Sequence, residues 1–232
     1  MTSNLNLLEQ LFDYYLVKSL ASKYLYTNDT TAKILGYHNR DDILGIDDRE
    51  IKCPAVAGAE QFMREDLQVT QTRQSMLHLD LHEYQDGQHI LMIKKVPYFE
   101  AGELIGLICG CTEYASDAMM KRCFALMALD QQYYFKQDHG RHYQLTPSID
   151  QGQLSSREMD CLFYLLRNKS AKAIARRLDL SYRTVEWHIA NVRLKLGCNN
   201  KTDLIERAVS DGYLQYLPLH LLMDSRGVWP SI

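Results

Sequence analysis

The C-terminal third of the chain carries a series of helix-start signals that constrains its fold more than any other feature. Ser155 and Glu158 have the spacing of a capping box, in which the serine hydroxyl and the glutamate carboxylate each accept a backbone N–H of the other residue. Ser170 and Ser181 precede two further amphipathic stretches, and a serine hydroxyl readily caps a helix. A tight connection at Asp179 joins these two stretches. Two short helices joined so closely predict a helix-turn-helix.

Apolar residues recur at i, i+3, i+4 and i+7 in the first two helices and at i, i+4, i+7 and i+11 in the third, which predicts one buried face for each helix. They are Met159, Leu162, Phe163 and Leu166 in the first helix, Ala171, Ile174, Ala175 and Leu178 in the second, and Val185, Ile189, Val192 and Leu196 in the third. A fourth helix, starting at Asn200 or Thr202, is predicted to follow Gly197.

The side of the third helix opposite its apolar stripe is predicted to face DNA. The N-terminal half of such a helix enters the major groove. We therefore predict that Arg183, Glu186, Trp187 and Ala190 read bases. Polar and basic residues around this face are expected at the phosphate backbone. They are Lys172, Arg176, Thr184, Asn191, Arg193, Lys195 and Lys201.

The distribution of charge supports this assignment, although the whole chain has a net charge of −3. Residues 1–150 hold 14 Lys and Arg against 21 Asp and Glu, whereas residues 151–214 hold 11 against 7. Lys and Arg supply most of the non-specific affinity for DNA. An acidic N-terminal region is therefore followed by a small basic module suited to phosphate.

The sequence blocks of this module resemble the LuxR-type helix-turn-helix, also called the NarL/FixJ type. The blocks are Leu154-Ser155-x-Arg157-Glu158, Ile174-Ala175, Leu180-Ser181-x-Arg183-Thr184-Val185-Glu186-x-His188, Asn191 and Lys195-Leu196-Gly197. The resemblance implies dimers on inverted-repeat DNA, with the fourth helix at the dimer contact. It places Glu186, Trp187 and Ala190 at bases, and Thr184 and Lys195 near the backbone. Trp187 departs from the small or basic residues common there, and an indole can pack against a thymine methyl group.

The N-terminal half is predicted to form an antiparallel sheet with inserted helices. Strands are expected at 12–18, 23–27, 76–84, 89–96 and 104–112, because aromatic, branched and alternating residues gather there. Asn28 leads into a short helix, and Asp86-Gly87 forms a hairpin turn. This order of strands and helices resembles a PAS domain. Four short segments also match residues that such domains carry: Leu35-Gly36-Tyr37, Leu44-Gly45, Lys94 to Tyr98 and Gly102 to Gly106. Such domains usually sense a small molecule, a cofactor-borne signal or a partner.

Candidate site residues in this half are fewer. Leu77 and Leu79 are expected on the inner face of their strand, and Leu107, Cys109 and Cys111 on that of the last strand, so all five are sensor-pocket candidates. His78, Asp80 and His82 are interpreted as a solvated face. No metal site is expected, because a strand places His78 and His82 about 13 Å apart. No cofactor is identified, and Cys53 lacks the setting of a flavin photosensor.

The predicted fold is α+β, with four parts along the chain. Residues 8–114 are expected to form a PAS-like five-stranded antiparallel sheet with helices, and residues 115–150 a helical linker with a candidate hairpin. Residues 151–214 are expected to form an all-α four-helix LuxR-type domain, followed by a docked apolar tail at 215–232. The chain has no signal sequence or membrane span, so the cytoplasm is its expected place.

The predicted function is sequence-specific transcription regulation by a homodimer, without enzymatic activity. Double-stranded DNA is the main expected partner, a small molecule in the PAS-like domain and RNA polymerase are further candidates, and no membrane partner is expected. Two alternatives stay open. The PAS-like domain could act as a protein-interaction, redox or cofactor module, or it could be an enzyme domain fused to a DNA-binding module.

Overall fold

The computed structural model describes residues 8–9, 11–113, 141–145, 154–218 and 220. The chain divides into two compact units, of which the first holds residues 1–116 and 137–142 and the second holds 117–136 and 143–232. Among the described residues, no helix combines the length and apolar character that crossing a membrane requires. The helix expected at 115–129 and the hairpin at 138–140 lie outside the described residues.

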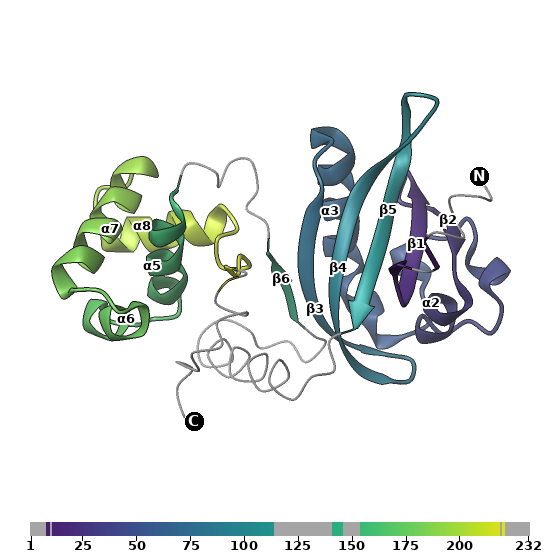
Figure 1. Ribbon diagram of the computed structural model, residues 1–232, viewed down its shortest axis with the longest axis horizontal. Helices are drawn as coiled ribbons and strands as arrows, with labels where there is room; N and C mark the ends of the chain where they lie inside the picture. Colours follow the sequence, from purple (N-terminus) through teal and green to yellow (C-terminus); the bar gives the residue numbers. More distant parts are fainter. Residues whose placement is uncertain (1–7, 10, 114–140, 146–153, 219, 221–232) are drawn as a thin grey trace. The chain divides into compact units, whose positions relative to one another are not determined.

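The first unit is built on one sheet with the strand order β2-β1-β5-β4-β3-β6 (Figure 1). Its strands are β1 (Tyr14–Ser19), β2 (Tyr24–Thr27), β3 (Met76–Tyr84), β4 (Gly87–Glu100), β5 (Glu103–Glu113) and β6 (Arg141–Gln144). Its helices are α2 (Asp29–Ile34), α3 (Ala59–Thr72) and the 3-10 turns η1 (Arg40–Ile43), η2 (Asp48–Glu50) and η3 (Pro54–Gly58). The first five strands confirm the predicted antiparallel sheet and its PAS-like layout.

Local sequence signals explain how these elements begin and join. Asn28 caps α2 by accepting the N–H of Thr31, as the sequence predicted. β3 and β4 form the expected hairpin, in which Tyr84 pairs with Gly87. Gly106 on β5 lies so close to β1 that a Cβ would meet the carbonyl oxygen of Lys18 at 1.9 Å. Only glycine allows the two strands to pair at this point.

One face of the sheet is covered by α3 and the short helices. α3 packs against β4, β5, η2 and η3. The strand register places Leu16 opposite Cys109, and both Cys111 and His78 opposite Ile93. Because residues directly opposite each other point to the same face, these side chains share the covered face.

The interpretation of β3 was wrong on one point. His78 and Asp80 are 0% exposed and His82 is 5% exposed, so their face is buried and not solvated. Asp80 lines the cavity of this unit, whereas Leu77 and Leu79 point to the opposite face by alternation. The polar side chains can be buried because groups of opposite charge meet them from α3 and β6.

A sixth strand, β6, extends the sheet beyond β3, where the sequence predicted only five strands and a linker. β6 has four residues, too few for alternation to distinguish it from a polar loop. The boundary between the units falls within β6, after His142. Gln144 belongs to the second unit, where it pairs with Tyr216 and its carbonyl accepts the N–H of Leu217. Leu217 is buried, as expected for the tail, while Leu219, Leu221, Leu222 and Trp229 lie outside the described residues.

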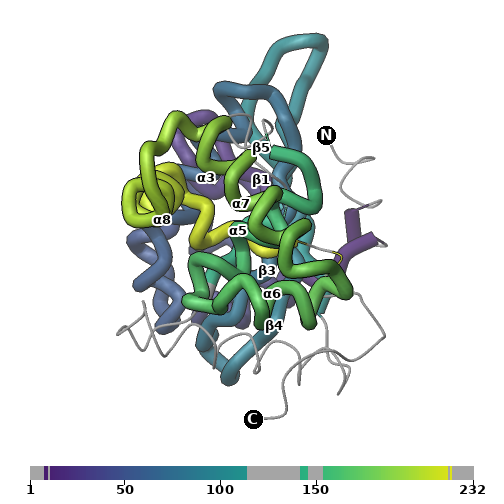
Figure 2. Tube along the Cα trace, turned by 90° about the vertical axis from the view of Figure 1, so that its left-hand side faces the viewer, coloured from purple at the N-terminus to yellow at the C-terminus, as the bar shows by residue number. Residues whose placement is uncertain are grey.

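The second unit contains the four predicted helices, packed together (Figure 1, Figure 2). They are α5 (Ser156–Leu166), α6 (Ala171–Leu178), α7 (Tyr182–Lys195) and α8 (Lys201–Ser210). The predicted caps at Ser155, Ser170 and Ser181 are confirmed. Of the two starts left open for the fourth helix, Asn200 is the one that caps it. The predicted apolar stripe of α5 is buried along its whole length.

Candidate functional site

The connection between α6 and α7 has the geometry of a helix-turn-helix. Asp179 ends α6 in the left-handed conformation with φ +54, and Leu180 donates its N–H to the Ala175 carbonyl. The Ser181 hydroxyl then accepts the N–H of Thr184, which starts α7. α7 packs against both α5 and α6, so its orientation is fixed by the helices on either side.

α7 buries one side and presents the other to solvent. Val185 and Val192 are buried against the core, and Ile189 is half-buried. On the opposite side Arg183 and Glu186 are exposed, and Trp187 is 60% exposed. A large aromatic side chain left in water on a basic helix marks a surface suited to a partner.

A groove of about 560 Å³ lies beside this surface, between α6, α7 and the start of α8. Its lining includes Lys172, Tyr182, Glu186, Ala190, Arg193 and Lys201. The structure thus brings two predicted base-reading residues together with three predicted phosphate contacts. Other residues predicted to contact DNA do not line the groove, among them Arg176, Arg183, Thr184, Trp187 and Asn191. Tyr182 was not predicted as a site residue, because it lies three residues before Val185 and seven before Ile189 and so continues the apolar stripe of the helix.

Lys195 has an intramolecular role that the sequence did not predict. Its ammonium lies 2.7 Å from the Glu158 carboxylate, which also accepts the N–H of Ser155 at 2.6 Å. Burial opposes the charged form of Glu158, but the hydrogen bonds from Lys195 and Ser155 outweigh it and lower the pKa of Glu158. Lys195 therefore supports the start of α5, and its predicted place at the DNA backbone stays a prediction.

The first unit contains a second candidate site, a cavity of about 70 Å³ between the sheet and the helices. Since one water fills about 10–15 Å³ on this measure, the cavity suits a small molecule. Of the predicted pocket residues, Cys109 and Cys111 line it, and Leu107 is buried in the same core. Leu77 and Leu79 do not line it. Apolar walls come from residues such as Leu16, Phe62, Leu91 and Ile93.

Two buried lysines form an ion-pair network at one end of this cavity. Lys18 contacts Asp48 at 2.5 Å and Asp66 at 2.8 Å, while Lys95 contacts Asp66 at 2.7 Å. Burial disfavours both ammonium groups, yet the neighbouring carboxylates raise the pKa of Lys18 and of Lys95. Tyr24 donates its hydroxyl to Asp48 at 2.7 Å. Both lysines are therefore charged and held rigidly.

This network was not predicted from the sequence, although the alternation of residues along two strands indicates its lysines. Lys18 follows Tyr14 and Leu16 at a period of two, and Lys95 follows Ile93 in the same way. A lysine that continues an apolar face of a strand is expected to be buried and paired. The partners Asp48 and Asp66 come from η2 and α3, which no local pattern in the strands indicates.

Comparisons with known proteins agree with the geometry of the second unit. Residues 152–208 match the family model described as bacterial regulatory proteins, luxR family. The chain is 39% identical over 61 residues to the transcriptional activator protein VanR of Vibrio anguillarum, covering 26% of this chain and 25% of VanR. It is 31% identical over 75 residues to the transcriptional activator protein LuxR of Aliivibrio fischeri, and this match covers 32% of this chain and 30% of LuxR. The matches thus span about a quarter to a third of these curated relatives.

Two solved structures of VqmA, the first of them from Vibrio cholerae, match the chain over most of its length. One, of the dimer in the absence of target DNA, is 28% identical, covers 96% of this chain and 93% of that chain, and has a TM-score of 0.49. Another, of VqmA bound to DPO, is 27% identical with a TM-score of 0.47.

The fold and the family match together define the class of the second unit. It is a helix-turn-helix module of the kind that binds DNA. More particularly, residues 152–208 form a LuxR-type helix-turn-helix domain, which follows a PAS-like domain in the chain.

Proposed function

We propose that this protein is a transcription regulator that binds a specific DNA sequence as a homodimer and responds to a small molecule held in its PAS-like unit. The observation that carries the proposal is the exposed face of α7, where Trp187 lies next to a groove lined by Glu186, Ala190 and basic residues. No enzymatic step is part of the proposal. We expect the protein to act in the cytoplasm. DNA is its main expected partner, and RNA polymerase is a further candidate.

Within this proposal the residues of the face have separate roles. Arg183, Glu186, Trp187 and Ala190 contact base edges, which supply sequence information. Lys172, Arg176, Thr184, Asn191, Arg193, Lys195 and Lys201 contact phosphates, which set the position of the helix. Two copies of α7 address half-sites about one DNA turn apart.

The PAS-like unit supplies the response to a signal. Support comes from the cavity and its rigid Lys18 and Lys95 network, which offers polar groups beside apolar walls. A ligand there would shift the population of dimer arrangements and so change DNA affinity.

Selection from random DNA with the full-length protein tests the first part of the proposal. We expect a two-fold-related sequence to be enriched, and fluorescence anisotropy then measures affinity for it. Trp187→Ala is expected to lose about 1–3 kcal/mol for the selected site, or roughly 5–150-fold. Lys172→Ala should weaken binding to all sequences alike and lower the salt slope by about 1.

Lys33→Ala serves as the matched control, since Lys33 is an exposed lysine on α2 of the first unit and does not line the groove. It should leave affinity for the selected site unchanged. If no sequence is enriched, or if Trp187→Ala and Lys172→Ala behave alike, the proposal fails. Native mass spectrometry of the full-length protein tests the second part, and a retained small molecule that is lost in Ile93→Phe would identify the cavity as its site.

A further inference from the structure

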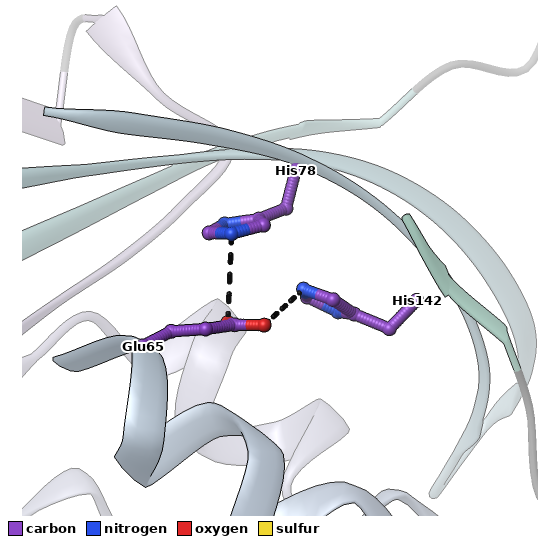
Figure 3. Close-up of side chains that lie close together, drawn as sticks. All are labelled: Glu65, His78 and His142. Atoms are coloured by element: carbon purple, nitrogen blue, oxygen red, sulfur yellow. Dashed lines mark ion pairs between the residues drawn. The ribbon is translucent and has the colours of Figure 1, made fainter. Parts of the chain in front are cut away.

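Three side chains from distant parts of the first unit converge on one buried point. Glu65 comes from α3, His78 from β3 and His142 from β6, and they point toward one another (Figure 3). His142 Nε2 lies 2.8 Å from Glu65 Oε1, and His78 Nε2 lies 3.7 Å from Glu65 Oε2. One ligand atom from each residue can be chosen so that all lie within 4.8 Å of one another.

The convergence is not explained by hydrogen bonding among the described residues. Both ring nitrogens of His78 and Nε2 of His142 are buried, and none of them has a well-directed hydrogen bond in the part of the chain that the structure describes. Glu65 Oε2 lies 3.2 Å from Lys95 Nζ, which holds the carboxylate in place. His78 is 0% exposed. Buried polar atoms of this kind are costly unless something binds them.

A second layer orients His142 as a ligand. Its Nδ1 lies 2.6 Å from Asp80 Oδ1, so the ring donates this N–H to a buried carboxylate and turns Nε2 toward Glu65 and His78. A carboxylate that holds the far nitrogen of a histidine is the usual second layer of a metal site. His82 Nε2 lies 3.1 Å from the same Asp80 oxygen.

The distances between the ligand atoms also fit a metal ion. His142 Nε2 and Glu65 Oε1 are 2.8 Å apart, and His78 Nε2 and Glu65 Oε2 are 3.7 Å apart. Metal bonds of about 2.0–2.2 Å place tetrahedral ligand atoms about 3.4 Å apart, close to the distances observed.

We propose that Glu65, His78 and His142 form a binding site for a divalent transition metal such as Zn²⁺, with Asp80 orienting His142. Two histidines and one carboxylate are a ligand set suited to Zn²⁺ that leaves a coordination position open. His142 also lines the cavity, so the open position can face it. The chain enters the second unit directly after His142, and the metal therefore ties that point of the chain to the sensor sheet.

Calorimetric titration of the chelator-treated, full-length protein without a histidine tag tests the proposal, with Zn²⁺ as the probe. We expect one Zn²⁺ per chain and a rise in melting temperature on binding. His78→Gln and His142→Gln should each weaken binding by at least about 100-fold, and Asp80→Asn by about 10–100-fold. His38→Gln is the matched control, because His38 is exposed and outside the cluster, and it should bind as tightly as the parent.

Absence of stoichiometric Zn²⁺ binding by the folded parent protein would overturn the proposal, as would unchanged affinity in His78→Gln and His142→Gln. X-ray absorption of the Zn²⁺-loaded parent protein does not depend on the folding of any variant. It should show two imidazole ligands, and a spectrum without imidazole would also overturn the proposal. DNA binding is not part of the measurement, so the site can fail or stand independently of the proposed function.

Discussion

The two units differ in what they bury. The interior of the second unit, called here the helical unit, is almost entirely apolar. The first unit is called the sensor unit after its proposed role, and the interior face of its sheet carries lysines, aspartates and histidines. The buried charged residues among the described residues of the helical unit are Glu158, Asp160 and Arg167, and all three belong to α5 or its C-cap. In the sensor unit Lys18, Lys95 and Asp80 are buried residues of the strands β1, β4 and β3. One unit is stabilised chiefly by burial of apolar surface, and the other also depends on ion pairs that must all be present.

The largest effect is expected from breaking the network of the sensor unit. Lys95→Met removes the partner of Asp66 and Glu65 and leaves uncompensated buried carboxylates. Loss of one member of a buried pair costs about 3–5 kcal/mol. Lys94→Met, at the exposed neighbouring position, should change stability by less than about 0.5 kcal/mol. Hydrogen exchange of β4 and β5 amides in urea measures the loss of stability in each variant. Equal losses in Lys95→Met and Lys94→Met would mean that the buried network does not stabilise the unit more than an exposed lysine does.

The same contrast explains what could be predicted from the sequence. The helices of the second unit follow from local signals, because Ser155, Ser170 and Ser181 cap them and apolar residues at helical spacing face the core. The strands of the first unit were also predicted, since β3 covers the 76–84 segment expected from alternation. Element type and position thus depend mainly on residues that are near in sequence.

The interior of the sensor unit could not be predicted in the same way. Alternation divides β3 into a leucine face and a polar face, but it does not show which face Glu65 and His142 will meet. Those partners lie 15 residues before Asp80 and 62 residues after it. The assignment of the polar face to solvent failed because its burial depends on contacts between distant segments.

A smaller effect is expected from removing a helix cap in the second unit. Ser155→Ala removes the hydroxyl that accepts the Glu158 N–H at the start of α5, which typically costs about 1 kcal/mol. Ser156→Ala, one position later and equally exposed, should have little effect. Urea unfolding followed by tryptophan fluorescence reports on this unit, since residues 187 and 229 are the only tryptophans and both belong to it. A loss as large as that of Lys95→Met would contradict the contrast between the two units.

The smallest effect on stability is expected at the residue most important for the proposed function. Trp187 is 60% exposed, so Trp187→Ala removes little buried surface and should change the free energy of unfolding by less than about 0.5 kcal/mol. Val185→Ala, two positions earlier and fully buried, should lower it by about 1–3 kcal/mol because it leaves a cavity. Urea unfolding and DNA affinity, measured on the same two variants, separate the two roles of α7. If Trp187→Ala destabilised the unit as much as Val185→Ala, the indole would be part of the core and not a surface for bases.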